Sequence, residues 1–159
     1  MKTHLPSVLI LVYSSLSIAC GGSEAPTSPT PQTTSTVPVT TVIAEGAFQV
    51  EDRATALRNN RPCDLAAFIP FTTTAQGTIE AIVDWTFSSN DINIEINRGR
   101  CDCALSTANA CPLEAISTNT SAKPERLTVR NLAAGDYTLL VLNFGPSPES
   151  GSYQVILTR

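Results

Sequence analysis

Histidine is almost absent from this chain of 159 residues, because the only one is His4, near the start. Without an imidazole further along, a Ser–His or Cys–His pair has no base, and the commonest metal ligand is missing. We therefore expect no enzymatic activity. Two carboxylates could still serve a glycosidase, and Asp84 and Glu95 are the candidate pair, on the outer faces of two successive predicted strands.

Basic residues are also few, with 10 Lys and Arg against 14 Asp and Glu. Nucleic-acid binding needs a concentrated basic face, so we expect no such partner. The chain also lacks a run of about 20 apolar residues, the length that crosses a bilayer. Instead, a shorter apolar run at residues 8–13 follows Lys2 and precedes small residues, which is typical of a secretory signal peptide.

The segment that ends this leader, Leu16-Ser17-Ile18-Ala19-Cys20, resembles the processing site of bacterial lipoproteins. In that family a diacylglyceryl group is attached to the cysteine, and cleavage leaves the cysteine first. Ala19 and Cys20 match the pattern, whereas Ser17 stands where the family usually has leucine. The resemblance implies that residues 1–19 are a lipoprotein signal peptide and that Cys20 is lipidated. The alternative is an ordinary signal peptide cut near Ala19.

The next segment, residues 20–41, is rich in Pro, Thr and Ser, a composition that cannot bury enough surface to fold. We expect a disordered tether there, and one domain of ordinary size at residues 42–159. The protein would then be exported and held in the cell envelope by its lipid, at the outer membrane or cell surface. We expect it to be a monomer.

Four cysteines remain in the domain, and an even count in an exported chain indicates two disulfides. They are Cys63, Cys101, Cys103 and Cys111. Their spacing differs from the C-x2-C pairs that structural zinc sites favour. Cys101 and Cys103 are two residues apart and make a poor pair, so one of them should bond Cys111 and the other Cys63. Spacing leaves open which.

Period-two alternation of apolar and polar residues predicts an antiparallel β-sandwich of about seven or eight strands. The clearest strand has isoleucine at 92, 94 and 96, and the row from Ile79 to Phe87 includes Trp85, which we expect in the core. Residues 98–112 predict a stapled loop, and 113–118 a short edge strand. Residues 42–61 stay unassigned, with strand signals at Phe48 and Val50 and a helical composition after them.

The last two predicted strands are apolar on both faces. We expect them to form a closing hairpin with a second apolar row on its outer side, made of Leu140, Leu142, Phe144 and Ile156. Either residues 42–61 pack over this row or it is an exposed docking patch, and we favour packing.

Two motifs resemble the bacterial pre-peptidase C-terminal domain family. Residues 91–96 read DINIEI, like the family's D-L-D-L-Y-L strand, and residues 125–139 with 152–157 resemble its closing signature. The resemblance implies a jelly-roll-like sandwich that rides on secreted peptidases as a non-catalytic appendage. In some relatives it binds collagen or polysaccharide, or holds calcium. Asn93 replaces an acidic residue of the motif.

A calcium site is therefore a candidate at Asp84, Asn90, Asp91 and Asn93, since Ca²⁺ takes carboxylate and amide oxygens from turns and strand starts. The same residues commonly cap turns, which is the alternative. We expect no other cofactor. The sequence as a whole indicates a non-catalytic binding or accessory module for a protein or polysaccharide. The alternatives are a structural envelope lipoprotein without a ligand, and a small secreted hydrolase.

Overall fold

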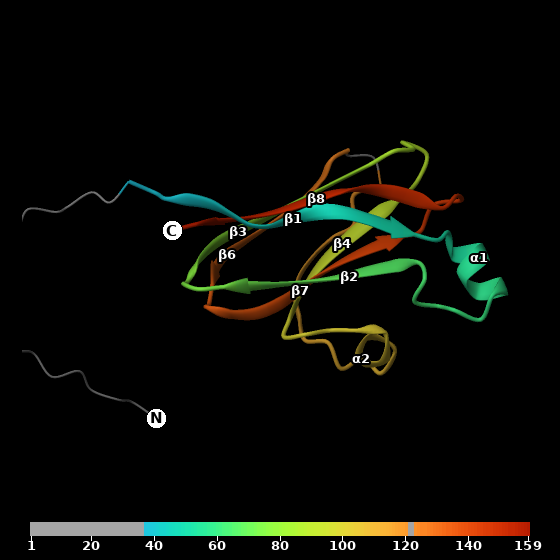
Figure 1. Cartoon of the computed structure of the whole chain (residues 1–159), viewed down its shortest axis with the longest axis horizontal. Coiled ribbons are helices and arrows are strands. Elements are labelled where there is room, and N and C mark those ends of the chain that lie inside the picture. Colours follow the sequence, from blue (N-terminus) through green and yellow to red (C-terminus); the bar gives the residue numbers. More distant parts are fainter. Residues whose placement is uncertain (1–36, 121–122) are drawn as a thin grey trace, which may run out of the picture. The chain divides into compact units, whose positions relative to one another are not determined.

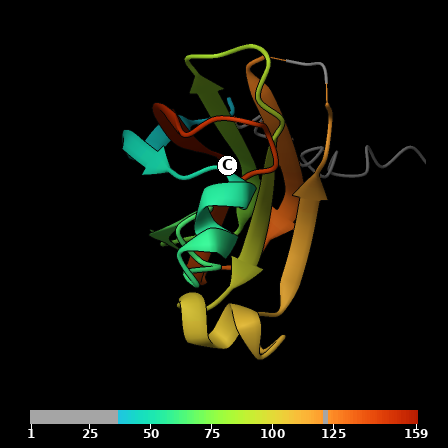
Figure 2. The ribbon, with the colours of Figure 1, turned by 90° about the vertical axis from the view of Figure 1, so that its right-hand side faces the viewer.

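The computed structural model describes residues 37–120 and 123–159, which form two four-stranded antiparallel sheets packed face to face (Figures 1 and 2). Sheet A has the strand order β1 (Thr40–Val50), β8 (Glu149–Thr158), β3 (Gly77–Trp85), β6 (Glu125–Leu132). Sheet B has the order β2 (Ala66–Thr73), β7 (Gly135–Asn143), β4 (Ile92–Arg98), β5 (Leu113–Ser117). The predicted antiparallel β-sandwich is confirmed.

The core lies between the sheets and follows the period-two pattern of the sequence. Alternate residues of β3 and β4 point inward and are fully buried, among them Ile79, Val83, Ile92 and Ile94. Trp85 is buried as expected, and its indole N–H donates to the Phe87 carbonyl at 2.9 Å. Phe87, the last residue of the predicted apolar row, is instead 53% exposed, because β3 ends at Trp85 and the chain bends at Thr86.

The unassigned segment forms one strand and one short helix. β1 begins at Thr40, two residues before the expected domain boundary, and extends sheet A beside β8. Helix α1 (Arg53–Arg58) follows, and the carboxylate of its N-cap residue Asp52 accepts from the Thr55 backbone N–H at 2.9 Å. This is the capping that starts helices, and it agrees with the helical composition of the segment.

The predicted closing hairpin is wrong. β7 pairs with β2 and β4 in sheet B, whereas β8 pairs with β1 and β3 in sheet A. The connection at residues 144–148 therefore crosses from one sheet to the other. The alternation within each strand cannot show whether two successive strands belong to the same sheet.

The predicted outer row is accordingly split. Leu140 and Leu142 lie on the outer face of sheet B, Ile156 lies on the outer face of sheet A, and Phe144 follows β7 with 41% exposure. Residues 42–61 do not cover them as a layer, since β1 lengthens sheet A at its edge.

The cysteine-bearing stretch covers part of the outer face of sheet B. It contains helix α2 (Cys103–Thr107) and is fixed by two disulfides, Cys63–Cys103 and Cys101–Cys111, with Cα–Cα distances of 5.7 and 5.8 Å. As expected, Cys101 and Cys103 do not bond each other, and each pairs with a more distant cysteine. The Cys101 backbone N–H donates to the Thr138 hydroxyl, which donates to the Gly99 carbonyl, both at 2.9 Å. Thr138 and Leu140 lie on the outer face of β7, and both are buried, with exposures of 0% and 2%.

None of the helices among the described residues is long and apolar enough to cross a membrane.

Candidate functional site

Three adjoining hollows follow strand β8 on and beside the outer face of sheet A, and we call them together the β8 trough. Along β8 they lie at residues 152–154, at 150–151 and at 149–150. Along β1 they lie at 45–46, at 47–49 and at 49–50, and the last hollow continues to Glu51 just after the strand. Their volumes are about 440, 550 and 530 Å³ in that order. The last two share Gln49 and Ser150, so the depression extends along the strands toward the end of the sandwich that carries α1 (Figure 1).

Small residues make the trough possible. Ala47, Ser150 and Ser152 present short, exposed side chains outward between the longer ones of β1 and β3. Beneath the floor, a Cβ added to Gly151 would lie 2.1 Å from the Asp84 carbonyl oxygen and 2.7 Å from the Phe48 ring. Only glycine fits there, and its absence of a side chain lets β8 approach β3 while Phe48 packs below.

The trough is lined by polar groups and is acidic overall. Hydroxyl, amide and carboxylate groups supply both donors and acceptors, and the Gln154 side-chain amide donates to the Glu45 carboxylate at 3.4 Å. Carboxylates along it are those of Glu45, Asp84, Glu51 and Asp64, while Glu149 is buried at its end. The lining therefore favours neutral polar or cationic ligands over anionic ones.

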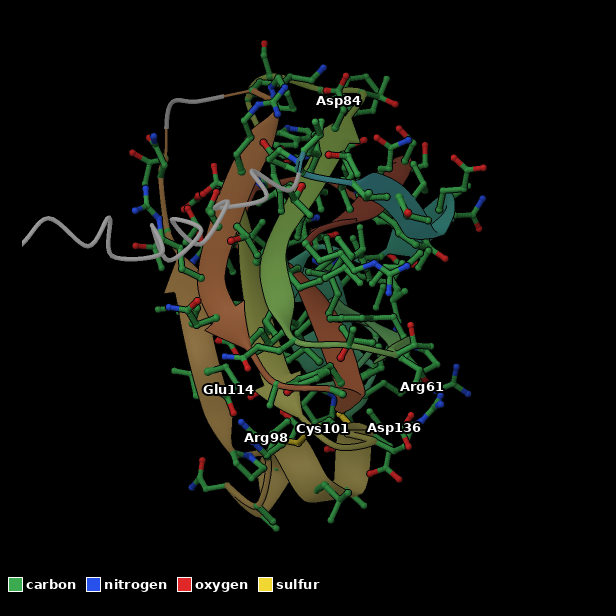
Figure 3. All side chains as sticks on the ribbon, turned by 90° about the vertical axis from the view of Figure 1, so that its left-hand side faces the viewer. Arg61, Asp84, Arg98, Cys101, Glu114 and Asp136 are labelled. Carbon is green, nitrogen blue, oxygen red and sulfur yellow. A yellow bond between two sulfur atoms is a disulfide. The ribbon has the colours of Figure 1, made fainter. Side chains whose placement is uncertain are left out.

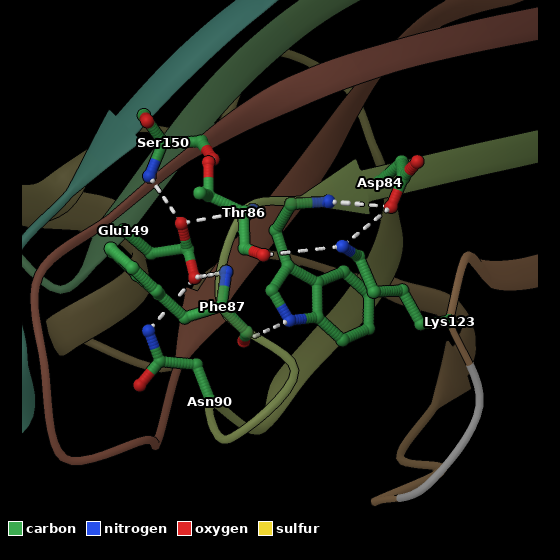
Figure 4. A network of polar contacts seen from close by, with 8 residues as sticks. Asp84, Thr86, Phe87, Asn90, Lys123, Glu149 and Ser150 are labelled. Atoms are coloured by element: carbon green, nitrogen blue, oxygen red, sulfur yellow. Dashed lines mark hydrogen bonds and ion pairs between the residues drawn. The ribbon is translucent and has the colours of Figure 1, made fainter.

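One lysine stands beside the middle of the trough. The Lys123 ammonium lies 3.5 Å from Asp84 Oδ1, 3.4 Å from the Thr86 carbonyl oxygen and 5.9 Å from the centre of the Trp85 ring (Figure 4). Exposed pairs of this kind contribute little to stability, but they fix where a charge is presented. Lys123 therefore places a positive charge next to Asp84, which lines the trough.

Glu149 fixes the loop at the end of the trough. Its Oε1 accepts from the backbone N–H groups of Thr86 and Ser150 at 3.1 and 2.8 Å. Its Oε2 accepts from the Phe87 N–H and from the Asn90 side-chain amide, both at 2.9 Å (Figure 4). The side chain is only 4% exposed. This carboxylate holds the loop from β3 to β4, and with it the exposed ring of Phe87, against the start of β8.

Two opposing effects act on the Glu149 carboxyl. Burial alone would raise its pKa, but the hydrogen bonds from Asn90 and from the N–H groups of Phe87, Ser150 and Thr86 outweigh burial and lower the pKa below the ordinary value. The group is therefore an anion whose charge is used structurally.

Sequence reasoning missed Glu149 because residues 145–152 look like a turn. The available signal was that Glu149 is the only charged residue in that segment. Its partners Thr86, Phe87 and Asn90 are 59 to 63 positions away, so no local pattern identifies them.

The four candidate calcium ligands lie on different parts of the sandwich, and the calcium site stays a prediction. Asp84 lies on the outer face of sheet A beside Lys123. Asn90 is buried, and its amide donates to Glu149 and accepts from the Ser147 N–H. Asp91 and Asn93 follow each other on the outer face of sheet B, and each has a buried oxygen without a hydrogen-bond partner. Within residues 37–120 and 123–159, no group of three or more His, Cys, Asp or Glu side chains could hold a metal ion.

The carboxylate pair considered for glycoside hydrolysis is also separated. Asp84 belongs to β3 in sheet A and Glu95 to β4 in sheet B, and both alternate with core residues. Their side chains therefore leave opposite faces of the sandwich. Asp84 lies far from the Arg98–Glu114 ion pair and from the cysteine loop in the end-on view of Figure 3.

Cys20, the predicted lipid attachment site, lies outside the described residues. A smaller apolar hollow of about 420 Å³ lies between α1 and the connection from β7 to β8, lined among others by Leu57, Phe144 and Pro146.

No family model matches the chain, and no curated protein matches its sequence at a significant level. Among solved structures it is similar to the mitogen derived from Yersinia pseudotuberculosis, with a TM-score of 0.47, 10% identity, and coverage of 76% of this chain and 87% of the mitogen. It is also similar to PirA, with a TM-score of 0.32, 10% identity, and coverage of 82% of this chain and 100% of PirA. Similarities at this level say nothing about function.

Proposed function

We propose that the protein is a non-catalytic binding module of the cell envelope that holds an extended protein or polysaccharide ligand in the β8 trough. The observation that carries the proposal is the line of three hollows over the small residues of β8. Binding sites are typically concave surfaces in which a few polar groups orient the ligand. Three shallow hollows in a row suit a linear molecule better than a compact one.

The chemistry of the lining supports a polar, uncharged or cationic ligand. Hydroxyl and amide groups at Ser150, Ser152 and Gln154 can exchange hydrogen bonds with sugar hydroxyls or with an extended backbone. The exposed ring of Phe87 at the end of the trough offers an apolar surface for stacking. The sequence adds a further argument against catalysis, because the chain has no histidine after His4.

The Phe87 end of the trough lies away from the point where residues 37–39 enter the domain. Val39 and Arg159 exchange backbone hydrogen bonds of 2.7 and 3.0 Å, so the chain enters the domain beside its C-terminus. Helix α1 lies at the opposite end of the sandwich, where the trough reaches Phe87 (Figure 1).

Filling the trough tests the proposal. The full chain and a Ser152→Phe variant would be applied to glycan and peptide arrays, with Thr128→Phe as the matched control, since Thr128 is exposed on the same face of sheet A but outside the hollows. We expect wild type and control to bind the same ligands and Ser152→Phe to lose at least tenfold in affinity. Equal binding by both variants would contradict the site. No binding by any form would favour a structural envelope protein without a ligand.

The anchor is tested separately. If Cys20 carries the lipid, Cys20→Ala should move the protein from the membrane fraction to the soluble fraction, because its acyl chains supply the membrane affinity. Cys63→Ala is not a suitable control since it breaks a disulfide, so Ser28→Ala, which lies beyond the processing site, serves instead. Membrane partitioning of Cys20→Ala equal to wild type would remove the lipoprotein interpretation while leaving the trough proposal intact.

A further inference from the structure

Four strands lie at the edges of the two sheets: β1 and β6 in sheet A, β2 and β5 in sheet B. An edge strand presents unpaired N–H and C=O groups that can pair with another chain, and natural proteins protect such edges with proline, charge or short length. The edges of this protein differ in how well they are protected.

Three of the edges carry such protection. β2 contains Pro70, which lacks an N–H group, β5 has five residues, and β6 presents Arg126 and Arg130. β1 is different, because its eleven residues include no proline, lysine or arginine and its only charge is Glu45. A register irregularity between Val42 and Ala44 interrupts only its first part.

The segment at 44–50 is open to a partner within the described residues. β1 pairs there with β8 alone. On its other side the first backbone hydrogen bond comes after the strand, where the Glu51 N–H donates to the Asp64 carbonyl at 2.7 Å. Seven regular residues of edge thus remain without a hydrogen-bonded strand partner, although β2 of the other sheet lies nearby, and seven residues is close to the length of a typical strand.

We propose that β1 pairs with β1 of a second copy, antiparallel, across a twofold axis at Ala47. In this register Ala47 faces Ala47, Gly46 faces Phe48, Glu45 faces Gln49 and Ala44 faces Val50. Residues directly opposite in an antiparallel pair point to the same face, so the inward side chains of one copy continue those of the other. The dimer goes beyond the ligand-binding proposal and replaces the expectation of a monomer.

The sequence of β1 favours this register over its neighbours. An axis at Glu45 would place two Glu45 carboxylates opposite each other, and an axis at Phe48 would place Glu45 opposite Glu51, in both cases a like-charge pair. An axis at Gly46 would bring Ile43, within the irregularity, into the pairing. An axis between two residues would set outward side chains against inward ones.

Pairing would join the two A sheets into one continuous sheet of eight strands. Glu45, Ala47 and Gln49 line the trough on its β1 side. The two troughs would then lie on one surface on either side of the twofold axis, as an isologous interface requires. Each copy contributes the wall next to the other's trough, so a long ligand could engage both.

Single cysteines test the register in the purified full chain treated with copper–phenanthroline. Ala47→Cys should give a covalent dimer on a non-reducing gel, because facing residues in an antiparallel pair lie about 4.5 to 5.5 Å apart at Cα, within reach of a disulfide. Gln49→Cys is the matched control. Its two copies would be four residues apart along the strands, about 13 Å, and should not crosslink. A mixture of Glu45→Cys and Gln49→Cys should crosslink.

Sedimentation of the uncrosslinked protein measures the dimer directly. We expect wild type and Thr128→Lys to sediment as dimers and Ala47→Lys as a folded monomer, since Ala47 is exposed. The melting temperature of Ala47→Lys should not depend on protein concentration, whereas that of wild type should rise with it. A monomeric wild type, or a dimer in which Ala47→Cys fails to crosslink, would overturn the proposal. The proposal would also be overturned if the protein were a monomer and the β1 amides were protected from hydrogen exchange only when an unrelated extended peptide was added. That result would assign the β1 edge to a different protein partner.

Discussion

The two outer faces of the sandwich carry similar strands but are used differently. On sheet B, the outward residues Asn97, Thr138 and Leu140 are buried although they point away from the core. On sheet A, the outward residues Ala47, Thr128 and Ser152 are exposed. The cause is the disulfide-fixed loop, which lies over sheet B through the hydrogen bonds of Cys101 and Gly99 to Thr138.

This difference indicates that the covered face of sheet B contributes to stability and that the open face of sheet A is available for binding. The covered face adds buried apolar surface beyond the two sheets, so substitutions there should be costly. The open face contributes little burial, so its side chains can vary with the ligand at small cost to folding. If this division is correct, the same chemical change should have opposite consequences on the two faces.

The largest expected effect comes from placing a charge on each face. Leu140→Asp removes a buried leucine and leaves an unpaired carboxylate in its place, so we expect about 5 kcal/mol of lost stability. Ser152→Asp puts the same carboxylate on the open face and should cost less than about 0.5 kcal/mol. Leu142→Asp should lie between them, because Leu142 is half-buried. Urea unfolding measures all three, and equal midpoints for the first two would refute the division.

Removing the Cys63–Cys103 bridge should uncover the protected face. The bridge closes a loop of 40 positions, for which the loop-entropy estimate is about 4 kcal/mol, against about 3 kcal/mol for the 10 positions between Cys101 and Cys111. The double variant Cys63→Ser, Cys103→Ser should also exchange the amide hydrogens of β7 faster than those of β8. Hydrogen exchange with mass spectrometry reads both strands in one experiment, and uniform acceleration across the two sheets would show that the loop does not protect sheet B selectively.

Most of the strands after β1 were predictable because each has an inward and an outward side. Ile92, Ile94 and Ile96 alternate with polar residues, and burial of every second residue follows directly. The same argument placed Trp85 in the core. The pairing of the strands was not predictable, since β7 and β8 alternate equally well in one sheet or in two.

The site was less accessible to sequence reasoning than the fold. The β8 trough depends on small residues of one strand lying between longer residues of two others, a relation that exists only after pairing. Glu149 likewise acts through partners about sixty positions away. The cysteines were the exception: a poor bond between Cys101 and Cys103 left two pairings, of which the structure has the one with Cys63–Cys103.

A moderate effect is expected from Glu149, which connects the open face to the loop at its end. Glu149→Gln replaces two carboxylate oxygens by one acceptor and one donor, and the donor then faces N–H groups. Hydrogen bonds to a charged group contribute about 1.5 to 3 kcal/mol, so we expect about 2 kcal/mol of lost stability at neutral pH. Glu45→Gln, on the exposed trough wall, is the control and should change little.

The same substitution predicts a pH dependence. Because the pKa of Glu149 is lowered in the folded protein from an ordinary 4.5, its contribution is present above about pH 4.5 and is lost as the pH falls through the folded value. Wild type should therefore lose stability toward acid faster than Glu149→Gln, and their melting temperatures should converge below pH 4.5. A gap that stays constant below pH 4.5 would mean that Glu149 is held for its shape and not for its charge.

The smallest effect should come from the ion pair on the open face, where Arg126 Nη1 lies 2.8 Å from Glu80 Oε1. The two side chains are 54% and 38% exposed, so water and salt screen their attraction, and fixing two long side chains costs entropy. A double-mutant cycle with Arg126→Ala and Glu80→Ala should give a coupling below about 0.5 kcal/mol that disappears at high salt. A coupling well above about 1 kcal/mol would mean that the open face also carries the fold. The distinction between a stabilising face and a binding face would then not hold, because substitutions on the outer face of sheet A would also lower the folding stability.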